Sequence, residues 1–423
     1  MALTARRTAA AAVPFSLALT LLACAPSAEA PVQVMALVRT GGSGGSYQPT
    51  QVALRTVSDP VTLQGSVANL IGGARIDVDP NDPLLRLNGG ALSEDQLARV
   101  FVKDSGRAPR VSYVQKDGVL WPADFHSWNL VTTYFNFEHA FDHFQQLGVP
   151  GARLAEVRVF YFPEFILREL SGQPLRDNAL FFSPVKSFMI LPFDELQRTP
   201  LSINQGIVTH EYAHVVWNRL VFNDAALPET LTRWSGNAAV NVNILKSLDE
   251  GFADFHAYAA SCRTPFGCDT RFMEASFDES LTNQRDMART DLCVSEGLRN
   301  SIATLGVNEF TGLGLHYQLG TVLAASLYHA GSGPEDWQSL SRAVVESYGN
   351  AQGGGLSGLL RENIETPQNF TLERVLQLLL DSVTSPELKT RLCGQFLGRL
   401  GVARENLGVS CPGAAVPAQG CAR

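Results

Sequence analysis

GIVTHEYAHVVWNRL, residues 206–220, decides the fold, because it places a metal-binding pattern inside an apolar helical stretch. His210 and His214 are four positions apart, so on a helix both imidazoles lie on one face and can reach a single ion. Glu211 follows the first histidine, rotated by about 100° around the helix axis, where its carboxylate can face a water molecule. The pattern H-E-x-x-H predicts a catalytic Zn²⁺ site with Glu211 as the general base.

The helix around this pattern is expected to begin near Ser202, because Ser202 and Gln205 have the spacing of a capping box. Apolar residues on both sides of the histidines indicate that the helix is buried. A core helix that carries two histidines by accident is the alternative interpretation. A third ligand distinguishes the two, since a catalytic zinc site has three protein ligands and an open position.

The third ligand is expected in SLDEGFADFHAY, residues 247–258. Glu250 and Asp254 are again four apart and face the same way on a second helix. Glu250 would bind the metal, and Asp254 would accept the outer N–H of a ligand histidine. The alternative is an ordinary helix start, where the helix dipole favours acidic residues. Beside H-E-x-x-H, the spacing of the two carboxylates favours the metal interpretation.

HEYAH followed by EGFAD resembles the gluzincin zinc metallopeptidases, in particular the thermolysin and fungalysin families. Their pattern is H-E-x-x-H, then a glutamate on the next helix, then an aspartate four residues later. The resemblance implies an α+β, two-lobed fold with a β-rich amino-terminal lobe, a mainly helical carboxy-terminal lobe and the zinc helix between them. It also implies a zinc-dependent endopeptidase, which hydrolyses peptide bonds with a metal-activated water.

Three further matches, in the family's order, extend the resemblance over about residues 131–330. DNALFF resembles the strand whose Asn-Ala pair binds the substrate backbone, which gives that role to Asn178 and Ala179. LHYQLGTVLAASLYHA resembles the segment with the family's transition-state histidine, here His316. QRDM is similar to a short stretch whose arginine contacts substrate, here Arg285.

Three features depart from the thermolysin pattern. The gap between the two ligand helices is longer, so residues 223–242 are interpreted as an inserted loop. Ala225 stands where counting places a transition-state tyrosine. Thr311 stands where a carboxylate usually supports the transition-state histidine, and Glu309 is the nearest acid. Two alternatives therefore stay open: an exported lipoprotein that keeps the zinc fold for binding or structure without turnover, and a zinc hydrolase acting on other substrates.

The first residues of the chain predict export. Residues 1–23 combine two arginines with an apolar run too short to span a bilayer, as in a signal peptide. The letters LLAC resemble a bacterial lipoprotein box, which implies lipidation of Cys24 and attachment to the outer membrane or cell surface. Cleavage at a following A-x-A pattern is the alternative and implies a secreted protein. Residues 24–46 contain GGSGGS and are expected to form a flexible tether.

Composition agrees with an exported globular enzyme, and the resemblance implies that its substrate is a peptide or protein. The chain has 423 residues, of which 45% are hydrophobic and 17% charged, enough for a large core. A net charge of −8 without a basic block argues against nucleic acid as a partner. Residues 47–205 are predicted to form the β-rich lobe and residues 206–423 the helical lobe.

The cysteines predict disulfides in an oxidising compartment. Seven cysteines become six when Cys24 is set aside, which suits three bridges. Cys262 and Cys268 are expected to close a small loop, and the pairing of the other four stays open. A thiolate metal site is the alternative, but the chain lacks a C-x-x-C spacing.

Hydrophobic periodicity places the remaining elements. His139 and His143 lie in a predicted helix over residues 131–146 and are expected to be solvated instead of binding metal. An exposed edge among the aromatic-rich strands would let an extended peptide add as another strand. Strands are predicted within residues 51–113 and over 157–162 and 179–193, and helices over 335–348, 372–383 and 386–400.

Overall fold

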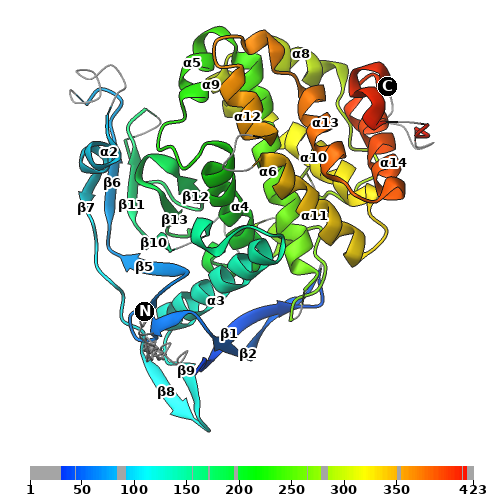
Figure 1. Cartoon of the computed structure of the whole chain (residues 1–423). Coiled ribbons are helices and arrows are strands. Elements are labelled where there is room, and N and C mark those ends of the chain that lie inside the picture. The colour runs from blue at the N-terminus through cyan, green and yellow to red at the C-terminus, as the bar shows by residue number, and fades with distance from the viewer. Residues whose placement is uncertain are drawn as a thin grey trace, which may run out of the picture.

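The structure is a computed structural model of the chain. It describes residues 30–42, 44–82, 92–154, 156–169, 172–194, 199–263, 265–277, 284–349, 354–411 and 413–416. Over these residues the fold is mixed α+β, with a β-rich amino-terminal region and a helical carboxy-terminal region (Figure 1). The predicted signal peptide and Cys24 lie outside the described residues.

The first strand overturns part of the predicted tether. β1 (Val32–Thr40) pairs antiparallel with β2 (Ser46–Leu54), and their sheet has the order β2-β1-β9-β8, with β8 at Tyr113–Lys116 and β9 at Val119–Pro122. The side chains of Val34, Ala36 and Val38 alternate along β1 and are completely buried. The glycine-rich run forms the turn of this hairpin, where Gly42 has a φ of +67° that glycine adopts without strain. The tether prediction is therefore wrong from Val32 onward.

A six-stranded sheet carries one wall of the candidate site. Its order is β12-β13-β10-β5-β4-β3, so β12 (Ala179–Phe182) is an edge strand, as the sequence predicts for this region. β12 runs antiparallel to β13 (Ser187–Ile190), whereas β10 (Val157–Tyr161) runs parallel to both of its neighbours. The inner strands are β3 at Val57–Asp59, β4 at Gln64–Gly65 and β5 at Ala68–Gly72.

A small third sheet and one long helix complete the amino-terminal region. The sheet has the order β11-β6-β7, with β6 at Arg75–Val78, β7 at Val102–Asp104 and β11 at Glu164–Leu167, beside α2 at Glu94–Phe101. The long helix α3 (Phe125–Gln146) covers β1, and Thr132 on it accepts a hydrogen bond from the Leu37 backbone at 2.9 Å. His139 and His143 on α3 are buried, so the prediction that they are solvated is wrong.

The helical region is built around α4 (Gln205–Val221) and α6 (Ala239–Ser261), which pack against each other, and α6 also packs against α10 (Leu315–Ala330) (Figure 1). Gly251 and Gly320 let α6 and α10 touch, because a Cβ added to Gly251 would lie 2.4 Å from the Gly320 carbonyl oxygen. The other helices are α5 (Glu229–Asn237), α8 (Glu296–Thr304), α9 (Val307–Gly312), α11 (Pro334–Tyr348), α12 (Gly355–Glu362), α13 (Leu372–Ser382) and α14 (Pro386–Gln395).

Two local predictions about the ligand helices need correction. Asn204, not Ser202, caps α4, because its side chain accepts the Ile207 N–H at 3.3 Å while Ser202 lies in a preceding 3-10 turn. Residues 223–242 are not a loop, since they contain α5 and the first turn of α6. The three predicted carboxy-terminal helices are present, and the last one ends in a π-helical turn at Phe396–Leu400.

Disulfides close two loops in the described part of the chain. Cys262 bonds to Cys268, as the sequence predicts, and Cys393 bonds to Cys411. Across the described residues, every helix is too short or too polar to cross a bilayer.

Candidate metal centre

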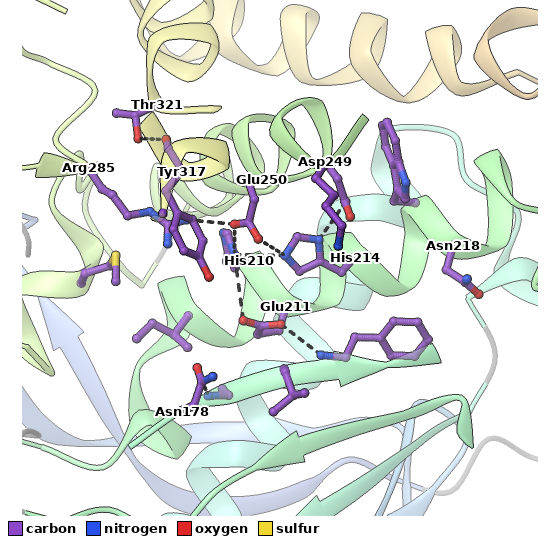
Figure 2. Close-up of a pocket in the computed structure, with 18 of the residues that line it drawn as sticks. Asn178, His210, Glu211, His214, Asn218, Asp249, Glu250, Arg285, Tyr317 and Thr321 are labelled. Carbon is purple, nitrogen blue, oxygen red and sulfur yellow. Dashed lines mark hydrogen bonds and ion pairs between the residues drawn. The ribbon is translucent and has the colours of Figure 1, made fainter. Parts of the chain in front are cut away.

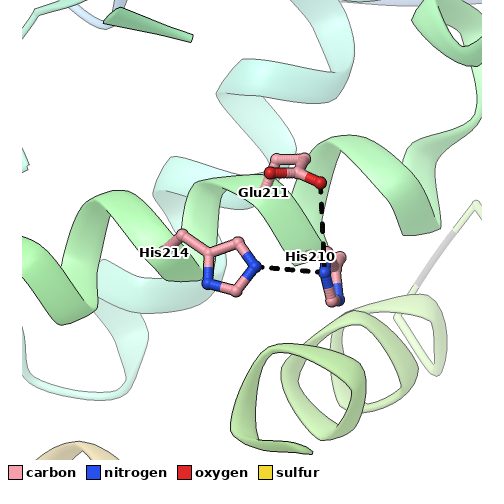
Figure 3. A group of neighbouring side chains, drawn as sticks. All are labelled: His210, Glu211 and His214. Carbon is pink, nitrogen blue, oxygen red and sulfur yellow. Dashed lines mark hydrogen bonds and ion pairs between the residues drawn. The ribbon is translucent and has the colours of Figure 1, made fainter. Parts of the chain in front are cut away.

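The two histidines of α4 point their outer nitrogens at one spot. Nε2 of His210 lies 3.1 Å from Nε2 of His214, and the two rings are perpendicular with centroids 4.8 Å apart (Figure 3). Both side chains are largely buried because α4 is packed on both sides by α3 and α6. Residues four apart on a helix face the same way, so this convergence follows directly from the sequence spacing.

Glu250 on α6 brings a carboxylate to the same spot. Its Oε2 lies 3.3 Å from Nε2 of His210, and its Oε1 lies 3.8 Å from Nε2 of His214 (Figure 2). Glu211 is close as well, because ligand-capable atoms of His210, Glu211 and His214 all lie within 4.8 Å of one another. Two imidazole nitrogens and two carboxylates therefore surround one point.

Carboxylates hold the opposite side of each imidazole ring. Asp254 Oδ1 lies 2.9 Å from Nδ1 of His210, the contact that the i, i+4 spacing of Glu250 and Asp254 predicts. Asp249 Oδ1 lies 2.8 Å from Nδ1 of His214. A proton on each Nδ1 leaves the lone pair of Nε2 free to bind a metal. The Asp249 contact has hydrogen-bond geometry, whereas Asp254 lies at ion-pair distance from His210 without the alignment of a hydrogen bond.

Asp249 is a functional candidate that the sequence interpretation missed. It belongs only to the alternative interpretation of this stretch as a helix start, which the structure excludes because α6 begins ten residues earlier, at Ala239. Within the helix, Asp249 precedes Glu250 and so projects toward the other histidine. The useful sequence signal is the pair of adjacent acids, Asp249 and Glu250, because neighbouring side chains on a helix can contact two different imidazole rings.

Arg285 is the cation that faces this cluster. Its Nη2 lies 2.6 Å from Oδ1 of Asp254 and 3.3 Å from Oε2 of Glu250, and its guanidinium lies 4.6 Å from the centre of the Tyr317 ring. These contacts tie Arg285 to the ligand helix. Four carboxylates, of Glu211, Asp249, Glu250 and Asp254, thus face one guanidinium, which leaves the described part of the site with an excess of negative charge.

The pKa values reflect this imbalance. Burial lowers the pKa of His214, but the charges of Asp249, Glu250 and Glu211 outweigh burial and raise it to about 10. Burial raises the pKa of Glu211, and the two histidines oppose this shift. Burial also acts to raise the pKa of Glu250, but His210, His214 and Arg285 hold it well below its usual range. The cluster therefore stabilises positive charge at the point where the two Nε2 atoms meet.

This donor set fits a divalent zinc ion. Two neutral imidazole lone pairs at 3.1 Å repel each other unless a proton or a cation lies between them. Two imidazole nitrogens and one carboxylate form the His₂Glu set of catalytic zinc sites, and excess negative charge offsets the cost of burying a cation. Glu211 is held apart from this set, because its Oε2 accepts the Phe181 backbone N–H at 3.2 Å.

A pocket of about 600 Å³ opens over the four residues His210, Glu211, His214 and Glu250. Its wall on the sheet side is β12, which contributes Ala179 together with the preceding Asn178. Arg285 and Tyr317 line the opposite side.

His316 is not among the residues that line this pocket, and its role at the reacting group stays a prediction. Its Nδ1 is buried without a hydrogen-bond partner among the described residues, and burial lowers the pKa of its ring to about 4. The next residue, Tyr317, lines the pocket instead. Adjacent residues on a helix differ by about 100° in direction, so the rotation of α10 decides which of the two faces the pocket.

Residues 223–242, the segment between the two ligand helices, also contribute to the pocket. Ala225 is not among the lining residues, whereas Pro228 and Leu231, at the start of α5, are. Lys246, one turn before Glu250 on α6, lines the same side. The sequence interpretation assigned none of these residues to the site, because nothing local indicates that α5 folds back over the cleft.

Comparison of the chain with protein-family models and with curated proteins finds no match, so the functional argument rests on the geometry of this centre.

Proposed function

We propose that the protein is a zinc-dependent peptidase of the thermolysin-like type, with His210, His214 and Glu250 as the metal ligands. The observation that carries the proposal is the meeting of these three side chains, at 3.1 to 3.8 Å from one another, on the floor of a pocket beside a free sheet edge. When bound, Zn²⁺ polarises a scissile carbonyl and lowers the pKa of a water molecule toward about 7.

Glu211 is the proton carrier in this proposal. It projects from the same helix as the two histidines but is held toward β12 by the Phe181 N–H at 3.2 Å. Its second oxygen, Oε1, is 3.9 Å from Nε2 of His210 and faces the open space of the pocket. From there Oε1 can accept a proton from a water molecule and deliver it to the leaving amine.

The edge strand β12 explains how a peptide would be held. In the six-stranded sheet β12 is the end strand and pairs with β13, and its Phe181 N–H is bound to Glu211, so a peptide that adds along this edge would take over that N–H. Asn178 and Ala179 line the pocket at the start of this edge, where the Asn178 side chain accepts the Ala179 N–H at 2.9 Å. Binding through the main chain accepts many sequences, because every peptide carries the same groups.

Tyr317 is the proposed donor to a developing oxyanion, since it lines the pocket while Arg285 beside it is held by Glu250 and Asp254. Figure 2 shows the Tyr317 ring reaching from α10 into the space beside Arg285, opposite Glu211. The charge of Glu250, together with burial, raises the pKa of the Tyr317 phenol, so it keeps its proton at neutral pH and can donate. In this proposal Tyr317 performs the role that the sequence assigned to His316. It also supplies the phenol of the expected transition-state tyrosine, at whose position Ala225 stands.

One preparation tests the proposal. The purified chain and its Glu211→Gln variant are loaded with Zn²⁺, and the metal content and the cleavage of a peptide library are measured for both. A peptidase of this type binds about one zinc per chain in both proteins and loses most of its cleavage in the variant. If the zinc-loaded parent protein binds peptides but cleaves none, the protein uses the zinc fold for binding. Cleavage of small esters or amides alone would identify a different zinc hydrolase.

A further inference from the structure

The part of the pocket beyond His214 differs in character from the metal centre. It is lined by apolar side chains from the end of α4, from the start of α5 and from α6, with a single lysine among them. We call this part the α5 subsite, and it consists of Phe222, Pro228, Leu231, Leu245 and Lys246. Pro228 and Leu231 come from the segment that separates the two ligand helices, so the subsite is an addition to the metal centre.

Lys246 is the basic residue of this subsite. It is four residues before Glu250 on α6, so the two side chains share one helix face and are about 6 Å apart along the axis. The side chain is half-buried and lines the pocket. A lysine on a pocket wall keeps its charge near solvent while its methylene groups pack along apolar neighbours.

The ammonium of Lys246 has no carboxylate partner within ion-pair distance in the part of the chain that the structure describes. The nearest acids on α6 are already engaged, since Asp249 holds His214 at 2.8 Å and Glu250 faces His210 and Arg285, each at 3.3 Å. Arg285, the other cation of the pocket wall, is in contact with Asp254 at 2.6 Å. Among the described pocket residues, Lys246 is therefore the cation available to a ligand.

We propose that the α5 subsite selects substrates with an acidic side chain, and that Lys246 binds the carboxylate of a glutamate or aspartate within two residues of the scissile bond. The inference rests on the proposed peptidase function and names its substrate class. Phe222, Leu231 and Leu245 pack against the methylene groups of the bound side chain and displace water. An ion pair beside apolar walls is stronger than one in bulk solvent, so the charge of Lys246 favours an acidic substrate side chain over a neutral or basic one.

The chemistry of lysine fits this role. A single ammonium on a flexible stem binds one carboxylate as a point charge and does not require the planar, two-point geometry of arginine. A neutral glutamine in the same position would leave the ammonium without a counter-charge, and a lysine would be repelled. A subsite of this kind rejects the wrong residue as well as accepting the right one.

The test uses matched peptides that differ only in having Glu, Gln or Lys at one of the two positions on either side of the cleaved bond. With zinc-loaded full-length protein, we expect kcat/KM to be about ten- to a hundredfold higher for Glu than for Gln at one of these positions. Lys246→Gln should reduce this ratio to about one, and Lys246→Glu should invert the preference toward Lys. Lys389→Glu, which makes the same charge change on α14, is the matched control and should keep the Glu preference.

Binding gives a second measurement that does not depend on turnover. In the zinc-loaded Glu211→Gln chain, fluorescence anisotropy should show tighter binding of the Glu peptide than of the Gln peptide, and Lys246→Gln should remove the difference. Zinc content and thermal unfolding of each variant confirm that the site is intact. Cleavage without any Glu preference, or a preference unchanged by both Lys246 substitutions, overturns the inference and leaves the peptidase. A Lys246-dependent preference in binding, without cleavage by the parent protein, keeps the subsite and overturns the peptidase.

Discussion

Oδ1 of Asp249 lies 2.8 Å from Nδ1 of His214, and this contact mirrors the 2.9 Å contact between Asp254 and His210. Each imidazole is thus held between a carboxylate and the proposed metal position. A carboxylate in this place fixes the ring and increases its basicity.

Asn substitutions at these two aspartates should weaken metal binding without abolishing it. We expect Asp249→Asn and Asp254→Asn each to lower zinc affinity by about 10- to 100-fold, because an amide orients the ring but lacks the negative charge. Competition with a chelator measures the affinity. Asp286→Asn is the control, since Asp286 follows Arg285 in the chain without facing either ring. Unchanged affinity in both variants would show that the two contacts do not act on the metal.

Removing Glu250 should have a larger effect than removing either aspartate. Glu250→Ala deletes one of three proposed ligands, so the chain should retain little zinc after dialysis. Glu309→Ala removes an exposed acid on α9 and should retain its metal. Metal analysis by mass spectrometry compares the two. A Glu250→Ala chain that keeps one tightly bound zinc would contradict the proposed ligand set.

Tyr317 and His316 make opposite predictions for activity. Tyr317→Phe should lower kcat by about 10- to 1000-fold with little change in KM, because the hydroxyl would act only on the transition state. His316→Gln should have a much smaller effect on kcat, since the ring does not line the pocket. Steady-state kinetics on one peptide measures both. The reverse order of effects would restore His316 as the transition-state residue.

The contact between α6 and α10 predicts a stability difference between two helical glycines. Gly251→Ala should destabilise the protein by about 1–3 kcal/mol, because the new methyl group would lie 2.4 Å from the Gly320 carbonyl oxygen and force the helices apart. Gly236→Ala, in α5, meets nothing within 4 Å and should be neutral or stabilising through helix propensity. Denaturant unfolding measures both changes. Equal effects would mean that the two helices are free to separate.

Three buried histidines outside the metal centre predict a loss of stability in acid. Burial lowers the pKa of His139 to about 4 and that of His256 to about 3, and it lowers the pKa of His143 well below its usual value. Between about pH 6.5 and pH 4 the unfolded chain binds protons that the folded chain does not, so the free energy of unfolding falls as pH falls.

Each of these histidines contributes up to about 1.4 kcal/mol per pH unit over that window. Above about pH 6.5 the contribution is constant, because both states are neutral there. Urea unfolding from pH 7.5 to pH 5 measures the slope, and His143→Gln should make it shallower. A slope that is the same in the parent and in this variant would remove His143 from the explanation.

Helix periodicity explains why the sequence predicted that His210 and His214 converge and that Glu250 and Asp254 face the same way, whereas the meeting of the two helices was expected from the resemblance. The spacings of His210 and His214 on α4 and of Glu250 and Asp254 on α6 are local properties, and any regular helix fulfils them. Their assignment as zinc ligands remains a prediction. The position of Asp249 needed the true start of α6, and the choice between His316 and Tyr317 needed the rotation of α10. Both depend on tertiary packing.

The amino-terminal strand shows a different limit. The glycines of GGSGGS suggested a tether, but the alternation of Val34, Ala36 and Val38 is the pattern of a half-buried strand. The partners of β1 include β9, more than eighty residues away, so local composition gave no sign of the pairing. The buried His139 and His143 were misjudged for the same reason, since their neighbours come from distant helices.

Helix α6 carries Glu250, which is one of the three proposed zinc ligands, and the ring-orienting Asp249 and Asp254. It also carries Lys246 and the glycine that contacts α10, Gly251. A deletion or insertion of one residue between Lys246 and Asp254 would turn the side chains after it by about 100° relative to those before it and so disrupt the centre. The segment that contains α5 precedes α6, and its length can vary without moving these side chains of α6. Sequence changes in α5 can therefore alter the substrate preference, whereas the number of residues between Lys246 and Asp254 in α6 has to stay fixed.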